Sequence, residues 1–148
     1  MNLPRRTINT VDYKSKNTWF GMAAILLVVA GFMIYQNRDS NVTLTNENMT
    51  IHGLYSAEIS YAEISEVNLV QSLPIIKLRT NGYSFLNYAK GYFRLADVGK
   101  AELFVNLKTP PFIHVKTKDG KVFYLNFSDP QKTQDLYSKL KTKLAGNN

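Results

Sequence analysis

The sequence predicts a mostly β domain that is closed by a C-terminal helix and preceded by one N-terminal transmembrane helix. Three observations support this prediction. Residues 19–35 form an apolar run without a charged side chain. From residue 49 onward, short runs of β-branched and aromatic residues alternate with turn-forming residues, as in an all-β sandwich or barrel. Residues 129–144 carry apolar side chains at three- and four-residue spacing, which predicts an amphipathic helix.

Composition limits the classes of protein to which the chain can belong. Its 148 residues suffice for one domain and an anchor. The absence of cysteine excludes a disulfide framework, a thiolate metal site and a cysteine nucleophile. The formal net charge is +7, and residues 49–148 carry thirteen Lys and Arg against eight Asp and Glu. No dense basic run occurs, so this surplus is interpreted as a solvated surface, with attraction to an anionic partner as the alternative.

The apolar run is interpreted as a transmembrane helix over residues 19–36, after an N-terminal tail of residues 1–18. Seventeen residues from Trp19 to Tyr35 span about 25 Å as a helix, close to the thickness of a hydrocarbon core. Trp19 and Tyr35 lie at the two ends, where amphipathic rings favour the membrane interface. A cleavable signal peptide is the alternative, since residues 28–30 resemble a cleavage pattern. The long polar segment before the run and its continuation past residue 31 favour an uncleaved anchor.

Flanking charges predict the orientation of this anchor. Arg5, Arg6, Lys14 and Lys16 precede the apolar run, and Arg38 alone follows closely. Because loops rich in Lys and Arg stay on the cytoplasmic side, the N-terminus is expected in the cytoplasm and the domain on the far side of the membrane.

The remainder divides into a polar linker, residues 37–48, and a β domain, residues 49–148. A strand is possible within the linker from Val42 to Leu44. Strands are expected at residues 49–51, 55–60, 64–69, 75–80, 83–88, 91–95, 102–107, 112–117 and 121–127. Asn81-Gly82 is expected to close a two-residue hairpin, because both residues tolerate positive φ, and Asp119-Gly120 is expected to form a second hairpin turn. Pro110-Pro111 interrupts the chain between two strands.

The chain is expected to end in a helix over residues 129–144. Ser128 or Asp129 supplies its N-cap, and Gln131 suits a capping box with Ser128. Its apolar stripe comprises Thr133, Leu136, Tyr137, Leu140 and Leu144. A helix of this kind can cover the open end of a small barrel and bury its stripe there.

Several segments, in this order, resemble small bacterial pleckstrin-homology (PH) domains of membrane proteins. The resemblance covers about residues 51–144 and is carried by residues 73–84 (LPIIKLRTNGYS), 90–95 (KGYFRL), 99–101 (GKA), 103–105 (LFV), 110–113 (PPFI), 119–120 (DG), 124–126 (YLN) and 136–137 (LY). It implies a PH-like fold, in which a seven-stranded barrel or pair of sheets is closed by a C-terminal helix. It also implies a bacterial protein and, with the anchor, the inner (cell) membrane.

The resemblance leaves the ligand open, because PH-like folds bind lipid headgroups, bind peptides or act as scaffolds. The basic cluster that phosphoinositide-binding members carry in their first hairpin has no counterpart here, where Glu58 and Glu63 stand instead. Phosphoinositide binding is therefore not carried over.

The candidate ligand-binding residues are Arg79, Asn81, Arg94 and Lys100, which lie in or beside the segments that carry the resemblance. An arginine fork suits a carboxylate or phosphate, although exposed strand residues are the simpler interpretation. No catalytic motif, metal-ligand spacing or nucleic-acid motif is found, so no catalytic residue, metal, cofactor or nucleic acid is expected. His52 and His114 are interpreted as structural.

These observations predict a single-pass, non-enzymatic binding or scaffolding module. Its partners are membrane lipid, through the anchor, and an unidentified protein. The first alternative is a sensor of anionic headgroups or phosphate that uses Arg79, Arg94 and Lys100. An enzyme is the last alternative, and it would require a deep pocket with converging titratable groups.

Overall fold

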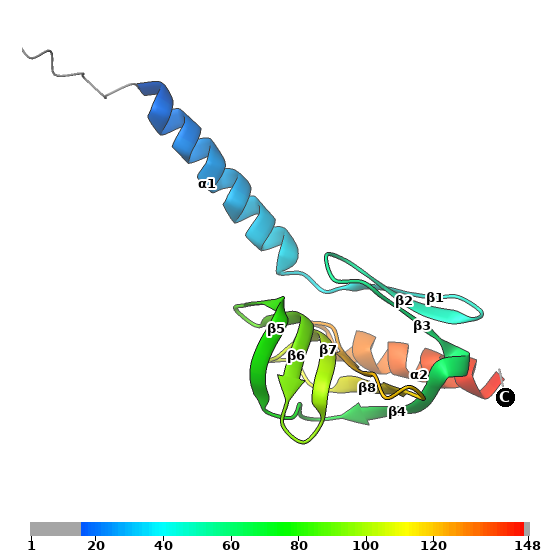
Figure 1. Ribbon diagram of the computed structural model, residues 1–148. Coiled ribbons are helices and arrows are strands. Elements are labelled where there is room, and N and C mark those ends of the chain that lie inside the picture. The colour runs from blue at the N-terminus through cyan, green and yellow to red at the C-terminus, as the bar shows by residue number, and fades with distance from the viewer. Residues whose placement is uncertain (1–15, 147–148) are drawn as a thin grey trace, which may run out of the picture. The chain divides into compact units, whose positions relative to one another are not determined.

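A computed structural model describes residues 16–146, which form one apolar helix and one mostly β unit (Figure 1). Contacts divide the chain into a unit that ends at Tyr35 and a second that begins at Gln36. Helix α1 (Lys16–Gln36), apart from its last residue, makes up the described part of the first. Within the described residues, one helical segment, Thr18–Tyr35, is long and apolar enough to cross a membrane, and its mean hydropathy is 2.0. The hydrophobic side chains of this segment are exposed along its whole length.

The second unit contains two sheets and a C-terminal helix. The three-stranded sheet has the order β1-β2-β3, and the six-stranded sheet has the order β4-β8-β9-β7-β6-β5. The strands are β1 (Asn41–Leu44), β2 (Asn48–His52), β3 (Ala57–Ser60), β4 (Ile64–Val70), β5 (Ile76–Phe85), β6 (Tyr88–Leu95), β7 (Gly99–Asn106), β8 (Phe112–Thr117) and β9 (Val122–Leu125). A short 3-10 helix (Tyr61–Glu63) joins β3 to β4, and α2 (Pro130–Gly146) follows β9. The β7–β9 pair is parallel and the other pairs are antiparallel.

The six-stranded sheet is buried on both faces because consecutive residues of its central strands point into different cores. Phe104 of β7 joins the first core, with residues of the three-stranded sheet and Leu136 and Leu140 of α2. Leu103 and Val105 join the second core, which is lined by β6, β7, β8 and β9. The expected mostly β fold with a closing C-terminal helix is confirmed, with nine strands in the described residues where the resemblance implied seven.

The domain begins earlier than the sequence analysis expected. The strand considered possible at Val42–Leu44 is β1, and it pairs antiparallel with β2. The preceding residues also pack on the domain, since Ser40 is buried and Asp39 hydrogen-bonds Ser128. Much of the segment expected as a linker therefore belongs to the compact unit.

The expected hairpin at Asn81-Gly82 is wrong. Strand β5 runs through this pair, and the turn to β6 lies at Leu86 and Asn87. The pair instead follows a register shift between Arg79 and Asn81. A Cβ at Gly82 would lie 2.7 Å from the Lys90 carbonyl oxygen. Glycine is therefore suited to this position because β5 and β6 approach closely there, and not because the chain turns.

The second expected turn and the C-terminal helix are confirmed. Gly120 has φ of +87° in the turn between β8 and β9. The Thr117 hydroxyl accepts a bond from the Lys121 N–H at 3.0 Å and donates to the Asp119 carboxylate, which closes the turn. Asp129 caps α2, because its carboxylate accepts a bond from the Gln131 N–H at 2.9 Å. Ser128 bonds to Asp39 instead of forming the expected capping box.

Candidate functional site

The candidate residues lie on β5, β6 and β7, and the strand register shows which of them share a face. Residues directly opposite one another on antiparallel strands project to the same side. One row contains Leu78, Arg94 and Lys100, and the next contains Asn81, Tyr92 and Glu102. We call these six residues the β5–β7 face. Three of the four predicted residues are thus brought together.

The fourth candidate, Arg79, lies on the other side of the sheet. It is opposite Phe93, whose side chain belongs to the second core. Arg79 is itself exposed, because β5 is the edge strand of the sheet. A single ligand on the β5–β7 face would therefore not contact Arg79 together with Arg94 and Lys100.

Two exposed cations stand side by side on the β5–β7 face. Arg94 and Lys100 are direct cross-strand partners, an arrangement in which like charges repel. Within residues 16–146, the ion pair that the structure contains is Lys121–Asp119, at 2.9 Å, so neither Arg94 nor Lys100 is neutralised by a salt bridge there. The pair can accept an anionic group from outside the domain. Leu78 and Tyr92 add exposed apolar and aromatic surface beside them.

A buried carboxylate lies in the second row. Glu102 is 8% exposed, and its Oε1 has no hydrogen-bond partner. Burial raises the pKa of Glu102, whereas the hydrogen bond from Tyr92 and the charge of Lys121 act in the opposite direction. The negative charge of Glu102 is the main cause that raises the pKa of Tyr92. The hydrogen bond fixes the Tyr92 ring while leaving nearly half of its surface exposed.

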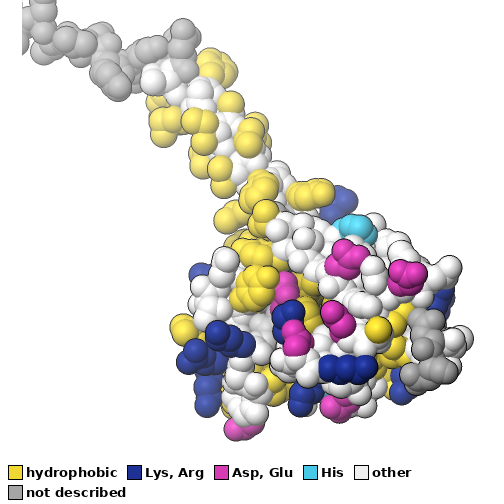
Figure 2. Space-filling model, turned by 45° about the vertical axis from the view of Figure 1, so that its right-hand side comes forward, with side chains coloured by type: hydrophobic (Ala, Val, Ile, Leu, Met, Phe, Trp, Pro, Cys, Tyr) yellow, Lys and Arg dark blue, Asp and Glu magenta, His cyan; other side chains and the backbone are white. Residues whose placement is uncertain are grey.

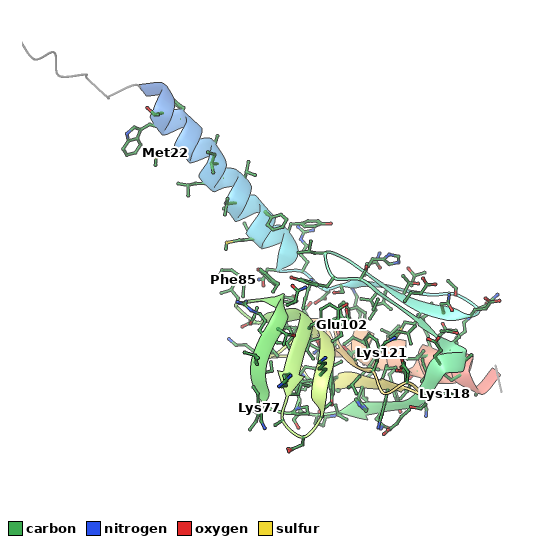
Figure 3. All side chains as sticks on the ribbon, viewed as in Figure 1. Met22, Lys77, Phe85, Glu102, Lys118 and Lys121 are labelled. Atoms are coloured by element: carbon green, nitrogen blue, oxygen red, sulfur yellow. The ribbon has the colours of Figure 1, made fainter. Side chains whose placement is uncertain are left out.

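Lys121 is the basic residue whose charge acts on Glu102. Its ammonium group pairs with Asp119, and Asp119 is the main cause that raises the pKa of Lys121. The Thr117 hydrogen bond is the main cause that lowers the pKa of Asp119, to about 2. Figure 3 labels Glu102 and Lys121, which come from β7 and from the end of the turn before β9. Acidic, basic and hydrophobic side chains are interleaved on the surface displayed in Figure 2.

The site carries a single buried carboxylate, and its chemistry suits binding. Among the described residues, no group of three or more His, Asp or Glu side chains could hold a metal ion. His114 packs against the Tyr124 ring with centroids 5.0 Å apart, and burial lowers its pKa. His52 is exposed and shares a 3.1 Å hydrogen bond with Thr43.

Two surface grooves lie elsewhere on the domain. One, of about 680 Å³, is lined by residues of the 3-10 helix, β4 and α2, among them Glu66 and Lys141, and by Glu47 and Lys118 from two turns. The other, of about 630 Å³, is formed by Leu44, Asn46 and residues of α2. The predicted ligand-binding residues line neither groove. The first groove mixes both charge signs, so it favours no ligand of one charge.

Sequence reasoning overlooked Tyr92 and Glu102 as functional candidates. One signal pointed to Glu102, since it is the charged residue within the buried run of residues 101–106. The predicted interface residues Trp19 and Tyr35 both lie in α1 with exposed rings. Their role at the membrane interface stays a prediction.

Comparison with known proteins identifies the family. A family model described as "Bacterial PH domain" matches residues 40–144. The chain belongs to the bacterial PH domain family. The match begins at Ser40 and therefore includes β1, ahead of the resemblance seen in the sequence. No curated protein and no solved structure matches the chain. PH domains are in general non-enzymatic binding modules, so membership supports a binding or scaffolding role.

Proposed function

We propose that this protein is a single-pass protein of the bacterial inner membrane whose PH domain binds a protein partner through the β5–β7 face. The observation that carries the proposal is the grouping on this face of Leu78, Tyr92 and Arg94, all exposed. Tyrosine and arginine are enriched among residues that dominate binding at protein interfaces. The domain is proposed to act without catalysis.

Two features of the face support protein binding. The hydrogen bond to Glu102 restrains Tyr92 before a partner arrives, which reduces the entropy lost on binding. The outer edge of β5 is unpaired in the sheet, and residues 81–85 pair one to one with β6 without a shift in register. This regular part of the edge could accept an extended segment of the partner as an additional strand.

The second part of the proposal is that the apolar helix anchors the protein in the membrane. It is long and apolar enough to span a membrane, and its side chains are unburied. The excess of Lys and Arg before the helix supports a cytoplasmic N-terminus and an extracytoplasmic domain. Tethering to a membrane raises the effective concentration of a partner in that membrane, so a weak contact can suffice.

Photo-cross-linking in cells tests the partner. A photoreactive amino acid replaces Tyr92 in the full chain, and a second strain carries it at Lys116, which is exposed on β8. We expect a discrete protein adduct from position 92 that is absent from position 116. The additional changes Arg94→Ala and Lys100→Ala should weaken that adduct.

The same experiment distinguishes the alternative, a sensor of anionic headgroups or phosphate. That alternative is favoured by the adjacent cations Arg94 and Lys100. Adducts to lipid alone at position 92, lost at high salt, would support it against a protein partner. No adduct of either kind would count against both uses of the β5–β7 face.

A further inference from the structure

The residues that directly follow α1 are fastened to one end of the domain. The Asp39 carboxylate accepts hydrogen bonds from the Ser128 N–H at 2.9 Å, the Ser128 hydroxyl at 2.7 Å and the Tyr88 hydroxyl at 3.2 Å. The Lys90 ammonium group donates to the Arg38 carbonyl oxygen. We call these contacts the Asp39 clasp. They hold the beginning of the compact unit on β6 and on the residue before the α2 cap.

The clasp limits how far this end of the domain can lie from a membrane that holds α1. The membrane-spanning segment ends at Tyr35, and residues 36–38 separate it from Asp39. Four Cα–Cα steps of at most about 3.6 Å cover roughly 14 Å when fully extended. The inference rests on the proposed anchorage, because the limit applies only if the segment is in the bilayer.

An exposed apolar cluster lies at the same end of the domain. Phe85 is opposite Tyr88, which contributes to the clasp, and Leu86 forms the turn between them. The Leu107 N–H donates to the Asn87 carbonyl oxygen at 2.6 Å, which places Leu107 beside this turn. Phe85, Leu86 and Leu107 are 40%, 71% and 37% exposed, and we call them the apolar tip. Figure 3 labels Phe85 and Lys77, which mark opposite ends of β5.

The backbone at the apolar tip is unusual for a leucine. Leu86 has φ of +51°, in the left-handed region that is unfavourable for a leucine side chain. Turns that need this conformation favour Gly, Asn or Asp. Leu86 is also largely exposed, so burial in the core does not offset its strain. Contact with an apolar environment outside the domain would offset it.

We propose that the apolar tip enters the headgroup layer of the same membrane that holds α1. The clasp keeps it within reach, and three apolar side chains on and beside a hairpin turn are suited to shallow insertion. The exposed Lys108, which follows Leu107, can approach anionic lipid headgroups at the same time. The domain would thus contact the membrane at two places, the helix and the tip, and these contacts would fix the direction of the β5–β7 face.

Site-specific fluorescence tests the proposal in the full chain, which contains no cysteine. Leu86→Cys carries an environment-sensitive NBD probe in vesicles of phosphatidylethanolamine and phosphatidylglycerol. Ile75→Cys is the matched control, since Ile75 is 75% exposed and lies before β5 at its opposite end. We expect a blue shift at position 86, and a loss of emission when the lipids carry brominated acyl chains. Position 75 should show neither change.

A third probe separates this inference from the anchorage itself. Met22→Cys places NBD within the segment proposed to span the membrane. Quenching at position 22 without quenching at position 86 would overturn the tip contact and leave the anchor intact. No quenching at position 22 would overturn the anchor. A blue shift at position 86 without quenching would place the tip against protein and also overturn the proposal.

A substitution at Asp39 tests whether the clasp holds the apolar tip at the membrane. Asp39→Ala removes the acceptor of three of the four clasp hydrogen bonds and leaves the bond from Lys90 to the Arg38 carbonyl oxygen. It should reduce quenching at position 86 and leave quenching at position 22 unchanged. Unchanged quenching at position 86 would show that the clasp does not hold the tip at the membrane.

Discussion

At the scale of single residues, Glu102 and Tyr92 form the most informative pair in the domain. Glu102 lies on β7 between Ala101 and Leu103, which belong to the second core, and its buried Oε1 has no hydrogen-bond partner. A buried polar atom of this kind generally costs about 1–3 kcal/mol. The Tyr92 hydroxyl hydrogen-bonds the same carboxyl group, so the ring that dominates the β5–β7 face is oriented by a residue that is itself hidden. Function at this site is therefore proposed to depend on a positioning residue beneath the surface.

The raised pKa of Glu102 predicts how stability depends on pH. The folded state retains the Glu102 proton to a higher pH than the unfolded chain does. The contribution of this group to the free energy of unfolding is therefore greatest at low pH and falls as pH rises through the folded pKa. Glu102→Gln has no such proton, so its free energy of unfolding relative to wild type should increase as the pH rises from the ordinary pKa of a glutamate, about 4, through the raised pKa of Glu102.

Urea unfolding of the full chain in detergent, followed by near-ultraviolet circular dichroism, measures this difference. Comparison of the two proteins at each pH cancels the titration of the other groups. A difference that does not change with pH would show that Glu102 titrates alike in the folded and unfolded states.

The strain at Leu86 predicts a stabilising substitution. Asparagine tolerates positive φ better than leucine, so Leu86→Asn should raise the free energy of unfolding in detergent by roughly 1 kcal/mol. Leu54→Asn is the control, because Leu54 is also exposed and is not among the residues with positive φ. It should change the free energy by less than about 0.5 kcal/mol. A loss of stability on Leu86→Asn would contradict the assigned strain.

At the scale of elements, one part of the edge strand β5 is protected from pairing with other strands, and another part is available for it. Register shifts between Ile76 and Leu78 and between Arg79 and Asn81 interrupt its pairing. Bulges and charged side chains on an edge discourage uncontrolled strand pairing. The regular segment from residue 81 to residue 85 remains available, which is consistent with a restricted site for an extended peptide.

Gly82 provides a test of the β5–β6 register. Gly82→Ala would bring a Cβ to within 2.7 Å of the Lys90 carbonyl oxygen, an atom that cannot move without shifting β6. We expect a loss of about 1–3 kcal/mol, as for other overpacked positions. Ser84→Ala, at an exposed site on the same strand, should have little effect. If the Asn81-Gly82 pair were instead a solvent-exposed turn, the Cβ of an alanine at position 82 would not contact β6. Gly82→Ala would then not cause this loss of stability.

At the scale of the whole molecule, two separate units share one chain. The apolar helix exposes its hydrophobic side chains, whereas the domain has two buried cores. The Asp39 clasp makes the first residues after the helix part of the domain instead of a free spacer. A short, fastened connection limits how freely the domain can move relative to a membrane that holds the helix.

The orientation in the membrane is tested by labelling a single cysteine. Lys139→Cys lies on an exposed position of α2 in a chain that has no other cysteine. We expect a membrane-impermeant thiol reagent to label it in intact cells once the outer membrane, where present, has been permeabilised. Labelling that requires lysis would place the domain in the cytoplasm and contradict the prediction from flanking charge.

Much of the architecture was predictable because it depends on neighbouring residues. A continuous run of hydrophobic residues predicted α1. The Asp119-Gly120 turn was predictable because Gly120 tolerates positive φ. The stripe of α2 placed Leu136 and Leu140 in the core. The Asn81-Gly82 prediction failed because a glycine also permits close strand approach, and the two uses have the same local sequence.

Of the candidate site, the sequence indicated Asn81, Arg94 and Lys100 but not that Arg79 faces away from them. Strand register decides which side a residue takes, and the bulges that set this register in β5 depend on pairing with β6. The row that joins Asn81, Tyr92 and Glu102 spans three strands, so its members are not marked by one local pattern.

By itself, the sequence determined the apolar helix, the mostly β class, the closing helix and the family resemblance. These follow from local periodicity and from motifs in a fixed order. Only the tertiary structure decided the β5–β7 face, the burial of Glu102 and the Asp39 clasp. The clasp joins residues 89 positions apart in the chain. Contacts of this kind form only when folding brings distant segments together, so no local pattern records them.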